Sequence, residues 1–391
     1  MDAAVFAAML SDKSITDYKK LMHKYSEANL KEFITLLYTN FFKPIPLRDF
    51  QERNLVYLES VMQLHQTSIR PLMSTKGKEM PYGIKAMESE IASTLTIENI
   101  DFARESVRKI LSGYAPSDDS EKRIYGIKRG LEYISNPQNK ITEANINELY
   151  QLAIAETLDE ESRLKPGNLY RHDSVYVIGQ ELEHTGLPHQ KLPEYMSELV
   201  EFAAGEDGMN DLIKAAAIHF YIGYLHPYFD GNGRMARLVH LWFLVQQGYS
   251  SVLFIPFSSY IEKERSSYYK VYSLTEQNAK LGGVTDITAF LAFFTERVYN
   301  KLKPEIRTEH PFEAFEKALE DGLVTEKEKD LWHFVLSAYG ADEFSTKQLE
   351  KDFGNAAYAT IRGFVLKFEK LGLLHAQRYS NRVKYKVNDN N

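Results

Sequence analysis

The chain has 391 residues, a length that predicts two or three domains, and its hydrophobic content of 44% and charged content of 26% are ordinary for a globular protein. It contains no cysteine, which excludes disulfides and thiolate catalysis and fits a reducing compartment. The formal net charge of −7 gives no general reason to expect nucleic-acid binding, so a nucleic-acid site would have to be a local patch.

The N-terminus has a short apolar patch, but it starts with an acidic residue and lacks a basic segment. We therefore expect no signal peptide. No run approaches the roughly 18 consecutive apolar residues of a membrane span, so we expect no membrane partner. Together these features predict a cytoplasmic location.

The first 75 residues predict helices, because apolar residues recur at three- and four-residue spacing over Ile15–Tyr25, Leu30–Phe42 and Phe50–His65. We interpret this region as a structural extension that packs on the next domain; a role in the choice of a partner is the alternative. Residues 74–83 contain glycine, lysine and proline and predict a linker.

The middle of the chain continues the helical pattern over residues 101–112, 120–134, 142–155, 192–204 and 211–225. One stretch, Tyr170–Gly179, is rich in β-branched and aromatic residues and predicts extended structure.

The segment from His226 to Arg237 has the sequence HPYFDGNGRMAR and begins where one apolar helix is expected to end and a second to start. Pro227 disfavours helical geometry at the preceding residue, so the first helix should end at His226. A second apolar run, Met235–Gln247, restarts the helix, and Gly248 is its expected C-terminal cap. The pattern predicts helix, loop and helix, with polar and charged side chains around the loop.

These residue types suit the phosphates of a nucleotide. Gly231 and Gly233 have no Cβ, so the backbone can approach a phosphate closely and adopt positive φ. Their N–H groups lie at a helix N-terminus, where free donors and the helix dipole favour an anion. Arg234 and Arg237 share one helix face and can clamp the outer phosphates.

Two further residues complete the predicted chemistry. Asp230 is a hard oxygen ligand for one Mg²⁺ that bridges phosphates. His226 titrates near neutrality, which makes it the candidate general base. The segment therefore predicts phosphoryl or nucleotidyl transfer to a hydroxyl. The alternative, a surface turn that merely joins two helices, accounts poorly for so many functional residue types within twelve positions.

The same segment resembles the signature of the Fic family, HPFxxGNGRxxR, with Tyr228 in place of the usual phenylalanine. Upstream, His219–Leu225 resembles the family's lead-in helix, with Gly223 where many members carry glutamate. The resemblance implies an all-α Fic domain with a small β-hairpin flap. It also implies transfer of AMP from ATP to a Ser, Thr or Tyr hydroxyl of a protein, with the Gly231–Arg234 backbone and the Asn232 side chain stabilising the α-phosphate.

Thr94, Glu98 and Asn99 match the family's inhibitory motif, (S/T)xxxE(G/N), although taken alone they would be read as a solvated helix face. The resemblance implies that Glu98 restrains productive ATP binding. The physical reason is that a carboxylate paired with Arg237 occupies the guanidinium and repels a γ-phosphate.

Two other features resemble the family less closely. Val177, Ile178 and Gly179, followed by His184–Pro188, resemble the flap, a hairpin that pins a target segment by backbone pairing. An ordinary surface hairpin is the alternative. Tyr268 and Tyr269 resemble a tyrosine pair that lines the nucleotide pocket, and half-buried packing is the alternative.

The last part of the chain predicts three helices, over 325–338, 345–353 and 356–371, and then a hairpin of Leu373–Arg378 with Arg382–Val387. This pattern resembles a winged helix-turn-helix. Residues 355–391 carry seven basic and two acidic side chains, a patch that can meet the phosphates of DNA. Winged helices also bind or pack on proteins, so the fold does not fix the partner.

We therefore expect an all-α protein with a helical extension (1–83), a Fic domain (84–305) and a winged-helix domain (306–391). The predicted activity is autoinhibited adenylyl transfer from Mg-ATP to a protein, with the chain itself as one acceptor. The alternative is a DNA-binding regulator whose Fic core senses a nucleotide.

Overall fold

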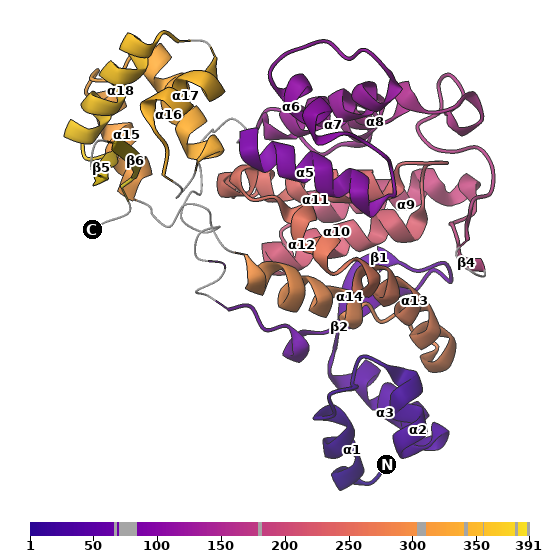
Figure 1. The fold of residues 1–391 in the computed structure, drawn as a ribbon. Coiled ribbons are helices and arrows are strands. Elements are labelled where there is room, and N and C mark those ends of the chain that lie inside the picture. The colour runs from indigo at the N-terminus through magenta and orange to yellow at the C-terminus, as the bar shows by residue number, and fades with distance from the viewer. Residues whose placement is uncertain are drawn as a thin grey trace.

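The computed structural model describes residues 1–65, 69, 84–178, 182–302, 310–339, 343–354, 356–379 and 382–388 (Figure 1). The predicted linker at 74–83 and the flap residue Gly179 lie outside the described residues. The prediction of a mainly helical fold is confirmed, since the only sheets among the described residues are three two-stranded hairpins.

The N-terminal unit has three helices, α1 (Ala3–Leu10), α2 (Tyr18–Tyr25) and α3 (Glu27–Asn40). They surround a small core that also contains Phe42, Val56 and Leu58. The helix predicted over Phe50–His65 is wrong. Strand β1 (Phe42–Arg48) instead pairs antiparallel with β2 (Asn54–Leu58), and a 3₁₀ turn follows at Glu59–Val61.

The physical reason for this error lies in β2 and in the turn before it. Residues 55–58 are all buried, so both faces of the strand are covered and its apolar run cannot be told from a buried helix by periodicity. The buried Asp49 carboxylate accepts the N–H groups of Gln51 and Arg53, each at 2.9 Å, and thereby fixes the tight turn between the strands.

The central unit is built from helices. They are α5 (Ile84–Ile97), α6 (Arg104–Leu111), α7 (Asp119–Ser135), α8 (Glu143–Ala153), α9 (Leu192–Ala204), α10 (Asp211–Leu225), α11 (Asn232–Gln246), α12 (Phe257–Lys263), α13 (Arg265–Gly282) and α14 (Thr288–Phe293). Short 3₁₀ turns lie at Ala155–Thr157, Glu160–Ser162, His189–Lys191 and Ser250–Phe254. After α14 the chain forms a π-turn, Phe294–Val298, and a 3₁₀ turn, Tyr299–Lys301.

Helices α10 and α11 lie at the centre of this unit. Figure 1 shows them between α5 to α8 on one side and α13 and α14 on the other. Nearly every residue of both helices is buried, which explains why their sequences are apolar all round rather than striped. The loop that joins them is therefore held by a rigid core.

A short hairpin of β3 (Tyr176–Ile178) and β4 (Leu182–Thr185) lies where the flap was predicted. The strands pair antiparallel, with Tyr176 opposite Thr185 and Val177 opposite His184. The pinning of a target segment by Val177 and Ile178 stays a prediction.

The C-terminal part contains α15 (His310–Glu320), α16 (Glu326–Ala338), α17 (Thr346–Phe353), α18 (Tyr358–Lys370) and an antiparallel pair, β5 (Leu374–Tyr379) and β6 (Arg382–Val387). Its buried side chains, such as Trp332 and Phe364, form a separate cluster. Helices α16, α17 and α18 and the hairpin lie within two residues of their predicted bounds, whereas α15 was not predicted. An added bridge joins Phe344 to Tyr385. The winged-helix assignment itself stays a prediction.

In the part of the chain that the structure describes, no helix combines the length and apolar character needed to cross a bilayer.

Candidate active site

His226 occupies a conformation that few residues adopt. It ends α10 with φ 54° and ψ 60°, in the left-handed region, while its N–H still donates to Ile222 O at 3.0 Å. A bulky side chain is uncommon there and must be held by its surroundings.

A buried arginine supplies much of that support. The Arg171 Nε donates to His226 O at 2.7 Å, and its backbone N–H donates to Pro227 O at 2.9 Å. Burial lowers the pKa of Arg171 to about 10, so the guanidinium stays charged at neutral pH. Gly186 leaves the space for this group, because a Cβ there would lie 2.7 Å from the Arg171 Nη2. Sequence reasoning missed both residues, since one arginine and one glycine near a strand carry no signal.

The hydrogen bond of the His226 ring fixes its tautomer. Nδ1 lies 3.2 Å from Gly223 O, and a carbonyl oxygen only accepts, so Nδ1 carries the hydrogen and Nε2 has a free lone pair. The pKa of His226 is lowered to about 4, and burial of the ring is the largest cause of this shift. The imidazole is therefore neutral near pH 7 and can accept a proton, as the predicted general base must.

Gly223, which replaces the glutamate of many Fic proteins, gives space to a tyrosine. A Cβ at this position would lie 2.5 Å from the Tyr272 hydroxyl oxygen and 2.9 Å from the ring. The Tyr272 ring therefore packs directly on the α10 backbone one turn before His226, and a larger residue at 223 would displace it.

The structure gives the Asn232 side chain a different part from the one expected. It is buried, its Oδ1 accepts the Tyr228 N–H at 2.9 Å, and its Nδ2 donates to Tyr228 O at 2.8 Å. Both ends of the amide are thus used inside the loop. Asn232 thus holds the loop closed, and its contact with a nucleotide stays a prediction.

Tyr228 fills the position where phenylalanine is usual. Its ring stacks on Tyr150 with centroids 3.8 Å apart and planes 6° apart. Its hydroxyl is buried and has no partner among the described residues. We expect Tyr228→Phe to raise the free energy of unfolding by about 1 kcal/mol, because an unpaired buried hydroxyl is removed. Urea unfolding of both proteins measures this difference, and a destabilised variant would show that the hydroxyl has a partner after all.

The N-terminus of α11 faces an anionic side chain on the side of Gly233. Gly231 precedes the helix with φ 86°, and a Cβ there would meet Ile154 at 2.5 Å. A Cβ on Gly233 would overlap the Glu98 carboxylate. Both glycines therefore let the backbone lie close to a neighbouring side chain: Ile154 at Gly231, and the anionic Glu98 at Gly233.

Arg234 and Arg237 are both buried beside this helix end. The Arg234 Nη2 contacts Asp230 at 3.1 Å. The Arg237 Nε donates to Thr94 Oγ1 at 2.7 Å, and its Nη2 pairs with Glu98 at 2.6 Å. Arg234 Nε and Arg237 Nη1 are buried and have no partner among the described residues. Charged donors left unpaired at a helix N-terminus make a site for an anion.

The three residues of the inhibitory motif lie together at the end of α5. Thr94 and Glu98 contact the same arginine across 143 and 139 positions of sequence. Asn99 follows with φ 54°, a left-handed conformation that asparagine tolerates better than most residues, and this explains Asn or Gly at the last motif position. The Glu98 carboxylate lies against Gly233 at the N-terminus of α11 and pairs with Arg237, and its inhibitory role stays a prediction.

The tyrosine pair divides into a core residue and a surface residue. Tyr268 is buried and its hydroxyl contacts His219 Nε2 at 2.8 Å. Tyr269 is 40% exposed, and its hydroxyl donates to Ile97 O at 3.0 Å. The contact of either tyrosine with a nucleotide stays a prediction.

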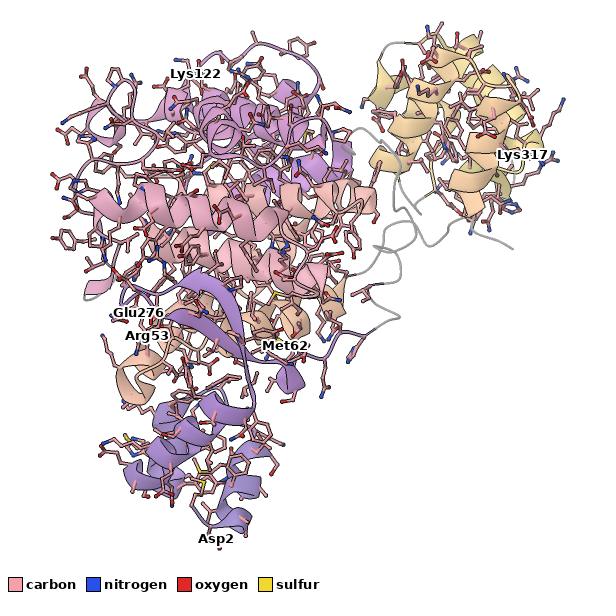
Figure 2. The ribbon with its side chains drawn as sticks, turned by 180° about the vertical axis from the view of Figure 1, so that it is seen from behind. Asp2, Arg53, Met62, Lys122, Glu276 and Lys317 are labelled. Carbon is pink, nitrogen blue, oxygen red and sulfur yellow. The ribbon has the colours of Figure 1, made fainter. Side chains whose placement is uncertain are left out.

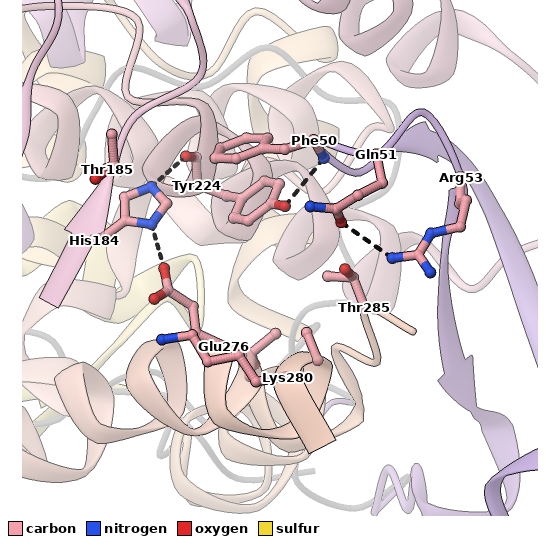
Figure 3. A pocket seen from close by; sticks show the side chains of 11 residues that line it. Phe50, Gln51, Arg53, His184, Thr185, Tyr224, Glu276, Lys280 and Thr285 are labelled. Carbon is pink, nitrogen blue, oxygen red and sulfur yellow. Dashed lines mark hydrogen bonds and ion pairs between the residues drawn. The ribbon is translucent and has the colours of Figure 1, made fainter. Parts of the chain in front are cut away.

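A cavity of about 440 Å³ lies between the β1–β2 turn, β4, α10 and α13 (Figure 3). One wall is the stacked pair Phe50 and Tyr224, with centroids 4.2 Å apart. On the other side His184 of β4 pairs with Glu276 of α13 through Nδ1 and contacts Tyr224 O through Nε2 at 2.6 Å. The His184 ring lies 6.3 Å from the His226 ring, so the cavity adjoins the candidate base.

This cavity was not predicted from the sequence. Its lining comes from the β1–β2 turn, the flap and α13, which are far apart in the chain; Figure 2 shows Arg53 of the turn near Glu276 of α13. From the sequence, His184 was expected only as part of the flap.

Asp230 fits one part of a magnesium site. Its side chain is 55% exposed, and its carboxylate accepts the Gly231 N–H and contacts Arg234. Within the described ranges no three His, Cys, Asp or Glu side chains gather to hold a metal. Mg²⁺ is usually bound through one or two carboxylates together with substrate phosphates and water. A single exposed carboxylate beside a phosphate site therefore fits Mg²⁺ that arrives with a nucleotide.

The C-terminal basic patch is partly neutralised. Lys367 pairs with Glu328 at 2.7 Å and Lys384 with Glu343 at 3.4 Å. Arg378 and Arg382 are exposed on the β5–β6 hairpin. The charge available to a nucleic acid is thus smaller than the sequence alone indicated.

Comparison with known proteins gives one family match: the Fic/DOC family model matches residues 140–244. A protein adenylyltransferase Fic from Drosophila ananassae is 25% identical over 265 residues, which are 64% of this chain and 48% of the relative. One of the same name from Culex quinquefasciatus is 26% identical over 262 residues, 63% of this chain and 49% of the relative. This chain thus spans about half the length of the curated relatives it matches. A Fic family crystal structure from Desulfovibrio desulfuricans aligns over 78% of this chain and 87% of its own, with 19% identity and a TM-score of 0.46.

Proposed function

We propose that this chain, whose residues 140–244 match the Fic/DOC family model, transfers the adenylyl group of Mg-ATP to a Ser, Thr or Tyr hydroxyl of a protein and is restrained by Glu98. The observation that carries the proposal is the end of α11. Arg234 Nε and Arg237 Nη1 have no partner among the described residues, and the anion beside this helix end is the Glu98 carboxylate. A built anion site covered by a competing carboxylate supports both the phosphate ligand and the restraint.

The chemistry follows from the roles of these residues. The hydroxyl oxygen forms a bond to the α-phosphorus, the bond from that phosphorus to the bridging oxygen breaks, and pyrophosphate leaves. His226 Nε2 takes the hydroxyl proton. Backbone N–H groups at the start of α11 stabilise charge that develops on the α-phosphate, and Arg234 and Arg237 hold the outer phosphates. Mg²⁺, held at Asp230, neutralises phosphate charge when it is bound.

We further propose that the nucleoside enters the cavity lined by His184, whose ring lies 6.3 Å from that of His226. Its aromatic wall suits a base, and the Glu276 carboxylate can accept a hydrogen bond from an amino group of that base. Glu276→Gln is expected to raise the KM for ATP about 3- to 30-fold, the loss of one hydrogen bond to a charged group, with a smaller change in kcat. Steady-state kinetics beside the exposed control Glu296→Gln test this. An unchanged KM would place the base elsewhere.

The test of the function itself uses two labels. The Glu98→Gly protein is incubated with Mg-ATP labelled at the α-phosphate or at the γ-phosphate. Adenylyl transfer puts label on protein from the α-position alone, whereas phosphoryl transfer does so from the γ-position alone. The chain itself is the first acceptor to examine, and added candidate proteins follow. No label from either position would contradict the proposal.

A second candidate function is a DNA-binding regulator with a nucleotide-sensing core, and the exposed Arg378 and Arg382 favour it. Binding to duplex DNA that weakens with added salt, and that is lost when both arginines are replaced, would support this alternative. The pairing of Lys367 and Lys384 with acidic residues weighs against it.

A further inference from the structure

A second carboxylate of α5 is buried and makes no hydrogen bond to the arginines of the phosphate site. Glu90 lies two turns before Glu98 and is 3% exposed. It accepts the backbone N–H of Ser258 at 2.8 Å and also the Ser258 hydroxyl. Next to this contact, Ser93 Oγ and Ser259 Oγ lie 2.8 Å apart. Two consecutive serines at the start of α12 thus hold the middle of α5.

Burial of this carboxylate is costly, because a charged group loses its hydration. Burial raises the pKa of Glu90, while the charge of Arg237 acts in the opposite direction. Arg237 gives its own hydrogen bonds to Thr94 and Glu98, so it does not bind Glu90 directly. A buried apolar residue of similar size would often be at least as stable, which points to a positional role for Glu90.

The spacing along α5 shows what Glu90 can position. Residues 90, 94 and 98 are four apart and lie on one helix face. Along that face Glu90 meets Ser258, Thr94 meets Arg237 at 2.7 Å, and Glu98 meets the same arginine at 2.6 Å. A slip of one residue would move these side chains by about 1.5 Å along the axis and by about 100° around it, and would break both contacts with Arg237.

We propose that Glu90 is the positioning residue of the inhibitory helix. By binding Ser258 it fixes the register of α5 on α12, so that Glu98 covers the α11 end and competes with the nucleotide. Glu90 touches no substrate and acts only through Glu98. This inference rests on the proposed function, since it gives that inhibition its structural support.

The test measures the affinity for Mg-ATP by calorimetry in two backgrounds, with Glu98 present and with Glu98→Gly. Glu90→Met keeps the size of the side chain but leaves the Ser258 N–H unpaired. With Glu98 present we expect it to strengthen ATP binding about three- to tenfold, a factor typical of losing one or two hydrogen bonds. In the Glu98→Gly background the same substitution should change the affinity less than twofold, because the residue that it positions is gone.

Two controls separate register from general destabilisation. Glu90→Gln can still accept the Ser258 N–H and should restore the unmutated affinity. Glu88→Gln alters a partly exposed residue of the same helix, which pairs with Arg108 at 2.8 Å, and should have no effect. An equal effect of Glu90→Met in both backgrounds, or no effect in either, would overturn the positioning role. If Glu98→Gly itself left ATP affinity unchanged, the proposed restraint would fail instead, so the two failures are distinguishable.

Discussion

Replacement of His226 by alanine should lower the rate of adenylyl transfer by about 10²- to 10⁴-fold, the usual contribution of a general base. The ring is neutral, its Nδ1 hydrogen is held by Gly223 O, and its Nε2 lone pair is free for the hydroxyl proton. Alanine cannot take that proton. The measurement is the rate of mass gain by one AMP in the Glu98→Gly background, with and without His226→Ala.

The left-handed backbone conformation of residue 226 makes a second variant necessary to interpret the loss of rate in His226→Ala. His226 has φ 54°, and alanine is strained there, so a loss of rate could reflect a displaced loop. Asparagine tolerates this conformation, so His226→Asn keeps the loop geometry while it removes the base. Equal losses in both variants, with Mg-ATP affinity unchanged, identify the missing proton acceptor. Transfer at the original rate in either variant would remove His226 from the role of base.

The same residue predicts the dependence of rate on pH. Burial lowers the pKa of His226 from its ordinary 6.5 to about 4, so the base form persists well below neutral pH. We expect kcat/KM to be flat from about pH 5.5 to 7.5 and to fall only as the pH approaches 4, where the ring gains a proton. A step near 6.5 in the pH profile would show that the ring is hydrated in the working enzyme and would contradict the buried geometry.

How much of this site the sequence can predict depends on how local each part is. The twelve residues from His226 to Arg237 predicted the loop, the glycine turn and the paired arginines, because those features need only neighbours in the chain. The contact of Glu98 with Arg237, which joins distant helices, was expected only through the resemblance to Fic proteins. The family match over residues 140–244 confirms that resemblance.

What the sequence did not predict depends on long-range packing. Arg171 binds the carbonyl of His226 from 55 positions away, and Gly186 makes room for it. The amide of Asn232 was expected at a phosphate, but its two bonds to Tyr228 depend on how the loop closes. The β1–β2 hairpin was predicted as a helix because both faces of β2 are covered by other parts of the fold. In each case the deciding contact is invisible in a local pattern.

Replacement of Glu98 by glycine should raise self-modification by roughly tenfold or more, the rate factor that corresponds to about 1.4 kcal/mol. The carboxylate pairs with Arg237 at 2.6 Å and lies against Gly233, so its removal frees both a guanidinium and the helix end for the phosphates. Intact-mass analysis should show a gain of one AMP that requires His226. A rate equal to that of the unmutated protein would remove Glu98 from the inhibitory role.

Replacement of Glu98 by glycine should lower the stability of the fold, although it raises the rate of self-modification. Arg237 is 3% exposed and would lose its charged partner, although Glu98 itself is 27% exposed and the pair is only partly buried. We expect the free energy of unfolding to fall by about 2 kcal/mol without nucleotide, less than for a fully buried pair. Mg-ATP should recover more stability in the variant than in the unmutated protein, because a ligand that binds the folded state stabilises it more the more tightly it binds.

Glu98→Gln distinguishes the charge of Glu98 from its bulk. It keeps the size of the side chain and removes the repulsion, so its rate of self-modification should fall between those of the unmutated protein and Glu98→Gly. A rate equal to that of Glu98→Gly would assign the inhibition to charge alone.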